Sequence, residues 1–155
     1  MRDTDWDDER ADTWRHYLAA SAQLVDRLDH ELQQHHDIAL VDYEILNELH
    51  DAPGKRLRMS DLASQVFVSR SRLTYRIDRL VEVGMVTREE CEDDRRGMWA
   101  IITDPGTEAY QAARISHQAA IDAWFFDQMS EDEMRSCRAV MGRIAAKLSQ
   151  EGPST

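Results

Sequence analysis

The hydrophobic period of the chain changes at Gly84, and this change restricts the folds that the chain can adopt. Before Gly84, apolar residues recur every three or four positions, as on one face of an α-helix. After it, two short runs rich in apolar and β-branched residues, 85–91 and 98–103, flank the polar segment 92–97, which predicts a β-hairpin. Helical spacing then returns. Helices interrupted by one hairpin predict a mostly α (α+β) fold.

Capping residues refine the predicted helix ends. Ser60 and Ser69 are good N-caps for the third and fourth helices. Asp104 is expected to cap the fifth, with Pro105 at its first position, and Ser130–Glu133 reads as a capping box for the last. A short extended link is predicted at 55–59. The predicted helices cover residues 13–36, 41–51, 60–66, 70–83, 105–129 and a last segment that contains 134–148.

Length and composition set the broad class of protein. The chain has 155 residues, of which 42% are hydrophobic, so it can bury a core as one domain or two small subdomains. Its N-terminus lacks the apolar region of a secretory signal, and its apolar runs are too short to span a bilayer. Two cysteines, Cys91 and Cys137, form no disulfide framework. We therefore expect a cytoplasmic protein without membrane association.

The charge is distributed unevenly along the chain. The net charge is −11, but ten Lys/Arg and eight Asp/Glu lie between Lys55 and Arg96, which makes that segment +2 and leaves −13 for the rest. Between Lys55 and Leu80 the ratio is seven to two. An acidic body with a basic middle is compatible with DNA binding, because the basic part attracts phosphates and the acidic part suppresses indiscriminate contact. A solvated charged surface is the alternative.

The fourth predicted helix carries the most informative pattern. A helical wheel turns Leu73, Ile77, Leu80 and Val81 inward, and it turns Ser71, Arg72, Tyr75 and Arg79 outward, with Arg70 in the exposed first turn and Arg76 at the flank. No acidic residue lies between Ser69 and Ile77, whereas an ordinary solvated helix usually balances Arg with Glu four residues away. We therefore favour insertion into the DNA major groove, where Arg bonds guanine O6 and N7, over a helix that is merely soluble.

This hypothesis assigns roles along the helix. Base contacts are expected from Arg70, Ser71, Arg72 and Tyr75, and phosphate contacts from Ser69 and Arg76, with Thr74 and Arg79 on the same DNA-binding surface. The predicted hairpin turn adds Asp94, Arg95 and Arg96. Paired arginines at such a tip suit the narrow minor groove, and Asp94 can orient Arg96 through a charge-assisted hydrogen bond. An ordinary polar turn is the alternative.

Together these elements have the order of a winged helix-turn-helix domain, and their residues resemble the MarR family of bacterial transcription regulators. The similar segments are Met59–Ala63, Val68–Thr74, Ile77–Leu80, Gly84–Val86, Arg88, Asp94–Arg96 and Ile102–Gly106. One departure is Phe67, which stands where the general helix-turn-helix pattern often has Gly. The resemblance implies a dimeric transcriptional repressor that binds double-stranded DNA at a pseudo-palindromic operator. In many members of the family a small aromatic ligand releases the repressor from its operator.

The resemblance also implies a domain division. It predicts that 37–104 form the winged DNA-binding domain and that 13–36 with 105–148 form a helical dimerisation domain. Residues 1–12, which are acidic and poor in apolar side chains, and residues 149–155 are expected to be flexible. The apolar faces of the terminal helices need a partner, and a second copy supplies it. An intramolecular bundle is the alternative for individual residues. The predicted dimer contacts are Trp14, Tyr17, Ile121, Trp124, Phe125, Val140, Met141 and Ile144.

Other functions find less support in the sequence. It has no glycine-rich phosphate loop, no metal-binding His/Glu helix motif and no nucleophile elbow, so we expect neither an enzyme nor a cofactor. The adjacent His35 and His36 do not converge as zinc ligands would, so no metal is expected. Cys91 and Cys137 are interpreted as structural. A protein-interaction module with an acidic surface, and a small-molecule binder with incidental DNA affinity, remain the rival classes.

Overall fold

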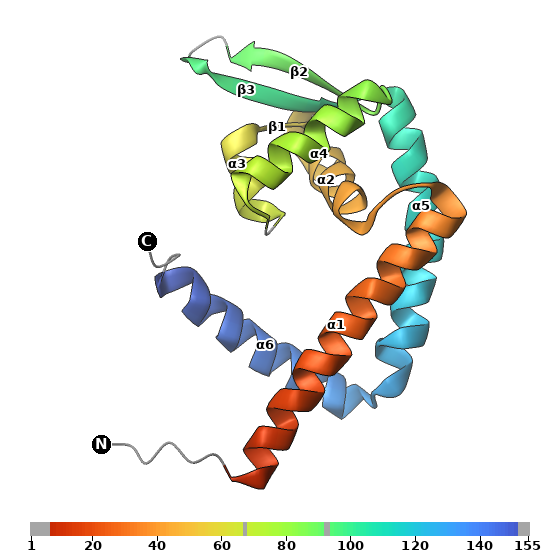
Figure 1. Cartoon of the computed structure of the whole chain (residues 1–155), viewed down its shortest axis with the longest axis vertical. Helices are drawn as coiled ribbons and strands as arrows, with labels where there is room; N and C mark the ends of the chain where they lie inside the picture. Colours follow the sequence, from red (N-terminus) through yellow and green to blue (C-terminus); the bar gives the residue numbers. More distant parts are fainter. Residues whose placement is uncertain (1–6, 67, 92–93, 152–155) are drawn as a thin grey trace. The chain divides into compact units, whose positions relative to one another are not determined.

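The predicted mostly helical fold with a small antiparallel sheet is confirmed (Figure 1). The computed structural model describes residues 7–66, 68–91 and 94–151. Its helices are α1 Asp8–His36, α2 Leu40–Asp51, α3 Met59–Gln65, α4 Arg70–Glu82, α5 Asp104–Trp124 and α6 Glu131–Glu151; its strands are β1 Arg56–Arg58, β2 Val86–Cys91 and β3 Asp94–Ile102. Short 3₁₀ turns occupy Pro53–Lys55 and Phe126–Gln128. The chain divides into two compact units, up to Gln118 and from Ala119.

The sheet is larger than the predicted hairpin. Its strand order is β1-β3-β2, and both neighbours of β3 are antiparallel to it. The expected link at 55–59 therefore contains a strand, since Arg56 pairs with Ile101 and Arg58 with Trp99. A strand of three residues is too short to show a period of two, so only its pairing reveals it. The expected turn at 92–97 is also shorter, because β3 already begins at Asp94.

The first helix starts earlier than the predicted Thr13. The Asp7 side chain caps it by accepting a hydrogen bond of 2.8 Å from the backbone nitrogen of Arg10. Asp8 and Glu9 occupy the first turn, where negative charge interacts favourably with the helix dipole. The acidic residues that suggested flexibility in the segment 8–12 are therefore the residues that start the helix. At the other end of the chain, α6 continues past the predicted residue 148 to Glu151.

Two predicted caps are confirmed. The Ser69 hydroxyl accepts a hydrogen bond from the backbone nitrogen of Arg72 at the start of α4. The capping box before α6 is also present: the Ser130 nitrogen donates to Glu133, and the Glu133 nitrogen donates back to the Ser130 hydroxyl. The pKa of the Glu133 carboxyl is lowered because its carboxylate accepts from the Ser130 hydroxyl and from the Ser130 backbone nitrogen. Both motifs are local in sequence, which explains why residue spacing alone identifies them.

Two other predicted caps are wrong. Ser60 lies inside α3, which begins at Met59, and its hydroxyl bonds Asp61. Asp104 is likewise the first residue of α5, and Thr103 supplies the cap. The Thr103 hydroxyl accepts from the Gly106 nitrogen at 3.1 Å and donates to the Gly84 carbonyl at 2.7 Å. One side chain thus joins the end of the α4 segment to the start of α5.

The core of the winged part lies beneath α4. Leu73, Ile77 and Leu80 are buried on its inner face as predicted, and the hydrophobic core also includes residues of α2, α3, α5 and the sheet. Val81 was expected inward but is 38% exposed. At 100° per residue it lies at the edge of the apolar stripe, so the core does not reach it. In the part of the chain that the structure describes, no helix is long and apolar enough to cross a membrane.

An aromatic cluster connects α2 with α5. The ring of Tyr43 lies 5.4 Å from that of Tyr110 and 4.4 Å from that of His117. The Tyr110 hydroxyl donates to the Asn47 side-chain oxygen at 2.7 Å. Burial raises the pKa of Tyr43 to about 12 and lowers the pKa of His117. The cluster is therefore most stable with a neutral imidazole.

His117 should make the stability of the protein depend on pH. Its pKa in the folded protein lies below the ordinary 6.5, with Tyr43 and Glu31 as its titratable neighbours. Below pH 6.5 the unfolded chain therefore takes up a proton that the folded chain resists, and the free energy of unfolding falls. His117→Phe, which retains a ring on Tyr43, should weaken the loss of stability between about pH 7.5 and pH 5.5. Urea titrations at both pH values test this, and an equal loss in both proteins would contradict it.

Gly106 is required by a close backbone approach at the start of α5. A Cβ atom at this position would lie 2.1 Å from the Met85 carbonyl oxygen and 3.0 Å from Ile102 Cγ1. Gly106→Ala should therefore lower the free energy of unfolding by about 3 kcal/mol, because backbone must move. Gly142→Ala is the matched control: nothing lies within 4 Å of its Cβ, and it should gain about 0.5–1 kcal/mol from helix propensity. Equal effects in thermal unfolding would refute the steric argument.

Candidate nucleic-acid interface

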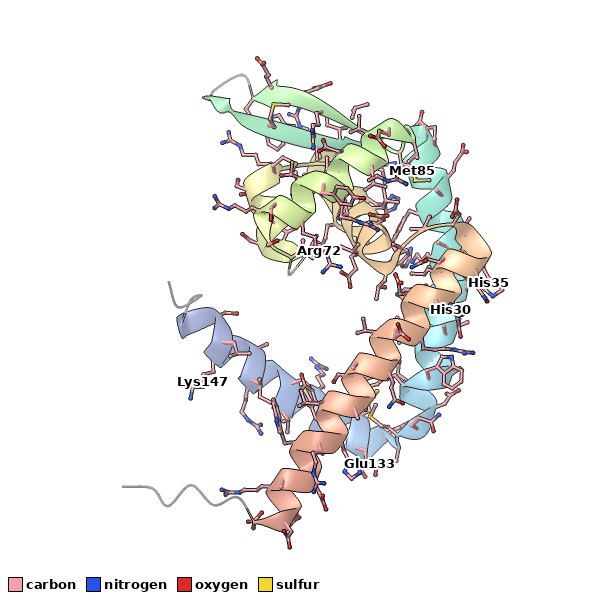
Figure 2. The ribbon with its side chains drawn as sticks, in the orientation of Figure 1. His30, His35, Arg72, Met85, Glu133 and Lys147 are labelled. Carbon is pink, nitrogen blue, oxygen red and sulfur yellow. The ribbon has the colours of Figure 1, made fainter. Side chains whose placement is uncertain are left out.

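The outer face of α4 is exposed almost throughout its length. The helix α4 follows α3 as the second helix of a helix-turn-helix (Figure 1). Its opposite face, with Leu73, Ile77 and Leu80, packs into the core. Figure 2 labels Arg72 on this helix. Tyr75, the largest apolar side chain of this face, is 60% exposed. The predicted DNA-contacting residues that are exposed here are Ser69, Arg70, Ser71, Arg72, Thr74, Tyr75 and Arg79.

The N-terminal half of α4 presents its positive charge without a neutralising carboxylate. Among the described residues, neither Arg70 nor Arg72 has a carboxylate oxygen within 4.0 Å. Arg79 does have an acid nearby, but the distance to Glu82 is 3.8 Å and both groups are largely exposed. A surface pair of this kind is weak and separates easily. All three guanidinium groups are therefore available to an incoming anion.

Arg76 lies differently from the predicted phosphate contact. Its Nε and Nη2 atoms both donate to the Asp42 carboxylate on α2, at 2.8 and 2.7 Å. The two side chains are only 21% and 16% exposed. Burial raises the pKa of the Asp42 carboxyl, and the Arg76 guanidinium partly offsets this effect. Arg76 thus attaches α4 to α2, which is a positioning role, and a helical wheel does not reveal it because the partner is 34 residues away.

A second ion pair supports α4 from the side of the hairpin. Arg88 on β2 lies 2.6 Å from the carboxylate of Asp78, and its Nη2 donates to the Thr74 carbonyl at 3.3 Å. Asp78 and Arg88 were not among the predicted site residues. The sequence signal available for Asp78 was its place as the first acid of α4, followed only by Glu82, but its partner lies on another element. The recognition helix is therefore held on two sides by ion pairs of opposite polarity.

The predicted wing contacts can be followed only in part. Asp94, Arg95 and Arg96 have their backbone in β3, but their side chains lie outside the described residues, so their contact with the minor groove stays a prediction. Phe67, in the connection between α3 and α4, also lies outside the described residues. The hairpin expected as the wing follows α4 in the chain, and it consists of β2 and β3, which pair in one antiparallel ladder.

The predicted dimer contacts are mostly exposed in the single chain. Among them, Trp14, Tyr17, Trp124, Val140, Met141 and Ile144 are 40–49% exposed. Ile121 and Phe125 are half-buried. The rings of Trp14 and Tyr17 stack on each other at 5.6 Å. The contact of these residues with a second copy stays a prediction.

The residues considered for other chemistry lie apart or are buried. No group of three or more His, Cys, Asp or Glu that could hold a metal is found among the described residues. Cys91 is buried and Cys137 half-buried, and both are free thiols. His36 bonds the Ser116 hydroxyl at 2.6 Å. His36 thus makes a hydrogen bond between α1 and α5, and Cys91 packs in the interior.

These features define a winged helix-turn-helix protein, and its relatives specify the family. A family model described as MarR family matches residues 36–97. AbsC, a MarR family transcriptional regulator from Streptomyces coelicolor, is 34% identical, with 95% of this chain and 99% of AbsC covered and a TM-score of 0.90. Sco3205 from the same organism, solved in complex with DNA, is 35% identical over 92% of this chain and 90% of its own, with a TM-score of 0.90. The chain therefore belongs to the MarR family of transcriptional regulators.

A more distant relative is also a transcriptional regulator. The HTH-type transcriptional regulator PecS of Dickeya dadantii is 26% identical over 133 residues, which cover 84% of this chain and 79% of PecS. The resemblance inferred from the residue motifs is thus confirmed by comparisons that span nearly the whole chain.

The Asp42–Arg76 pair should contribute strongly to the stability of the winged part. Asp42→Ala and Arg76→Ala should each lower the free energy of unfolding by about 2–3 kcal/mol, because each leaves a partly buried charge without its partner. The double variant should lose less than the sum of the two, and urea titration of all four proteins measures this coupling. Arg135→Ala, which removes two exposed ion pairs on α6, should change stability by less than about 0.5 kcal/mol. Additive losses would refute the coupling.

Proposed function

We propose that this protein is a homodimeric, sequence-specific repressor that binds a pseudo-palindromic operator and is released by a small aromatic ligand. The observation that carries the proposal is the exposed face of α4, which lacks an acid over its first two turns and lies on the fold of MarR family regulators. The related Sco3205 was solved in complex with DNA, which supports the same partner for this chain. Binding rather than catalysis is the proposed activity, and an operator target implies a cytoplasmic location.

The proposed readout uses both grooves. Arg70, Ser71, Arg72 and Tyr75 contact base edges in the major groove, while Ser69 and Arg79 contact phosphates. Arg95 and Arg96 enter the minor groove, oriented by Asp94. Arg76 acts through Asp42 by fixing the direction of α4, which replaces the phosphate contact first expected of it. Thr74 donates to the Arg70 carbonyl and stabilises the first turn from within.

The proposed dimer is supported by an apolar stripe along α6. Met134, Cys137, Met141, Ile144 and Leu148 follow one another at alternating spacings of three and four residues. This spacing forms the seam of a helix that packs against another helix. Four of the five side chains are at least 40% exposed in the single chain. A second copy would cover this stripe, and an isologous dimer requires an operator with two-fold symmetry. Trp14 and Tyr17 of α1 are separate proposed dimer contacts.

The proposed effector has a candidate site beside the recognition helix. A hollow of about 600 Å³ is lined by residues of α1, α2 and α4, among them Val25, Leu40, Glu44, Arg72 and Arg76. Its lining combines seven apolar side chains with Gln33 and five charged residues, Asp26, Asp29, Glu44, Arg72 and Arg76, and small-molecule sites use polar groups of this kind to orient a ligand. A ligand that contacts Arg72 or Arg76 there would shift the population away from the DNA-competent position of α4.

Selection of binding sites from random duplex DNA tests the function. We expect an inverted repeat, with half-sites about one helical turn apart, and a steep linear fall of log K with log salt. Arg72→Ala should relax the preference at one base pair of each half-site, equivalent to about 1–3 kcal/mol of discrimination. Arg114→Ala removes an exposed Arg of α5 and should select the same repeat as the unaltered protein.

The outcomes separate the rival classes. If no duplex is enriched and only weak salt-sensitive binding remains, the proposed function is wrong and the protein-interaction module gains support. If a repeat is enriched but Arg72→Ala keeps the full preference, Arg72 is removed from the base readers. A single half-site without its inverted copy would contradict the dimer.

A further inference from the structure

The short strand β1 carries two arginines that have no part in the DNA contacts proposed for α4 and the hairpin. Arg56 and Arg58 alternate with Leu57, so they point to the same face of the sheet, while Leu57 packs against the core. Unlike Arg76 and Arg88, neither has a carboxylate oxygen within 4.0 Å among the described residues. Among the described residues of the winged part, arginines without a nearby acid therefore include those at the start of α4 and those on β1.

Trp99 of β3 holds both guanidinium groups. The Arg56 guanidinium carbon lies 4.7 Å from the centre of the Trp99 ring, and that of Arg58 lies 5.5 Å away. Trp99 is also the direct cross-strand partner of Arg58. Cation–π contacts at these distances order the side chains without neutralising them. Two positive groups on one ring repel each other, and an anion that bonds both would relieve that repulsion.

Arg58 also borders the DNA-reading surface. A hollow of about 420 Å³ is lined by Arg58 and Ser60, by Thr74 of α4 and by Gly97 and Met98 of the hairpin, with Met59 and Arg88 completing the lining. This position lies where the recognition helix meets the wing. DNA whose major groove receives α4 and whose minor groove receives the wing must pass its backbone across this junction.

We infer that Arg56 and Arg58, ordered by Trp99, form an additional phosphate-binding site for the DNA backbone between the two grooves. The inference rests on the proposed function and deepens it. A phosphodiester has two free oxygens that can accept from two guanidinium groups. Such a contact positions the duplex and carries no sequence information. Glu89 of β2 is the cross-strand neighbour of Trp99 on its other side, and its charge opposes the binding of phosphate.

Salt titration of DNA binding tests this site on the duplex selected above. In Arg56→Ala/Arg58→Ala, the slope of log K against log salt should become shallower by about 1, because one phosphate fewer is neutralised. The base preference should not change. The matched control is Arg138→Ala/Arg143→Ala, which removes two exposed arginines of α6 and thus the same charge; its slope should stay that of the unaltered protein.

Two further variants test the role of Trp99 and of Glu89. Trp99→Leu should lower affinity roughly fivefold while keeping both charges, whereas Trp99→Phe should retain most of the affinity because it keeps a ring. Glu89→Gln should raise affinity. Arg56→Lys/Arg58→Lys should preserve the salt slope, because it keeps both positive charges. This variant therefore tests the site even if the alanine variant does not fold.

The possible results are distinct from a failure of the proposed function. If the unaltered protein selects an operator and the alanine pair keeps its salt slope, or if the α6 control loses as much, the additional phosphate site is wrong and the proposed function stands. If the unaltered protein binds no duplex, both are wrong.

Discussion

The orientation of α4 depends on the pair between Asp42 and Arg76. Hydrophobic burial of Leu73, Ile77 and Leu80 fixes which side of the helix faces the core, but apolar contacts are non-directional and tolerate rotation about that stripe. A bidentate guanidinium–carboxylate contact has a defined geometry, so it specifies the remaining degree of freedom. The Asp78–Arg88 pair does the same toward the hairpin. The ion pairs therefore fix the orientation of α4, whereas burial of its apolar residues stabilises its packing on the core.

The same division explains how a chain with a net charge of −11 can present a basic surface. In the winged part, the arginines that orient elements are neutralised by acids from other elements, and those at the start of α4 and on β1 are not. Most of the acidic residues lie outside the segment between Lys55 and Arg96. Total charge is thus a poor guide to the surface potential of this protein, whereas the pairing of individual side chains is a good one.

Sequence reasoning succeeded where the determining contacts are local. The Ser69 cap, the capping box at Ser130 and the change from helix to hairpin after Gly84 all depend on residues within a few positions of one another. It failed where a distant partner decides the structure. The strand β1 exists because β3 pairs with it, and Arg76 turns inward because Asp42 is there. At Asp104, the local pattern was correct but one residue late, since Thr103 also reaches the Gly84 carbonyl.

The Thr103 hydroxyl has a mechanical consequence. It is bonded at once to the segment that ends α4 and to the first turn of α5, and Gly106 beside it leaves no room between α5 and the Met85 backbone. The connection between α4 and α5 is therefore rigid at this point. The angle between α4 and α5 at this corner is thus constrained twice, by the hydrogen bonds of Thr103 and by the close backbone approach at Gly106.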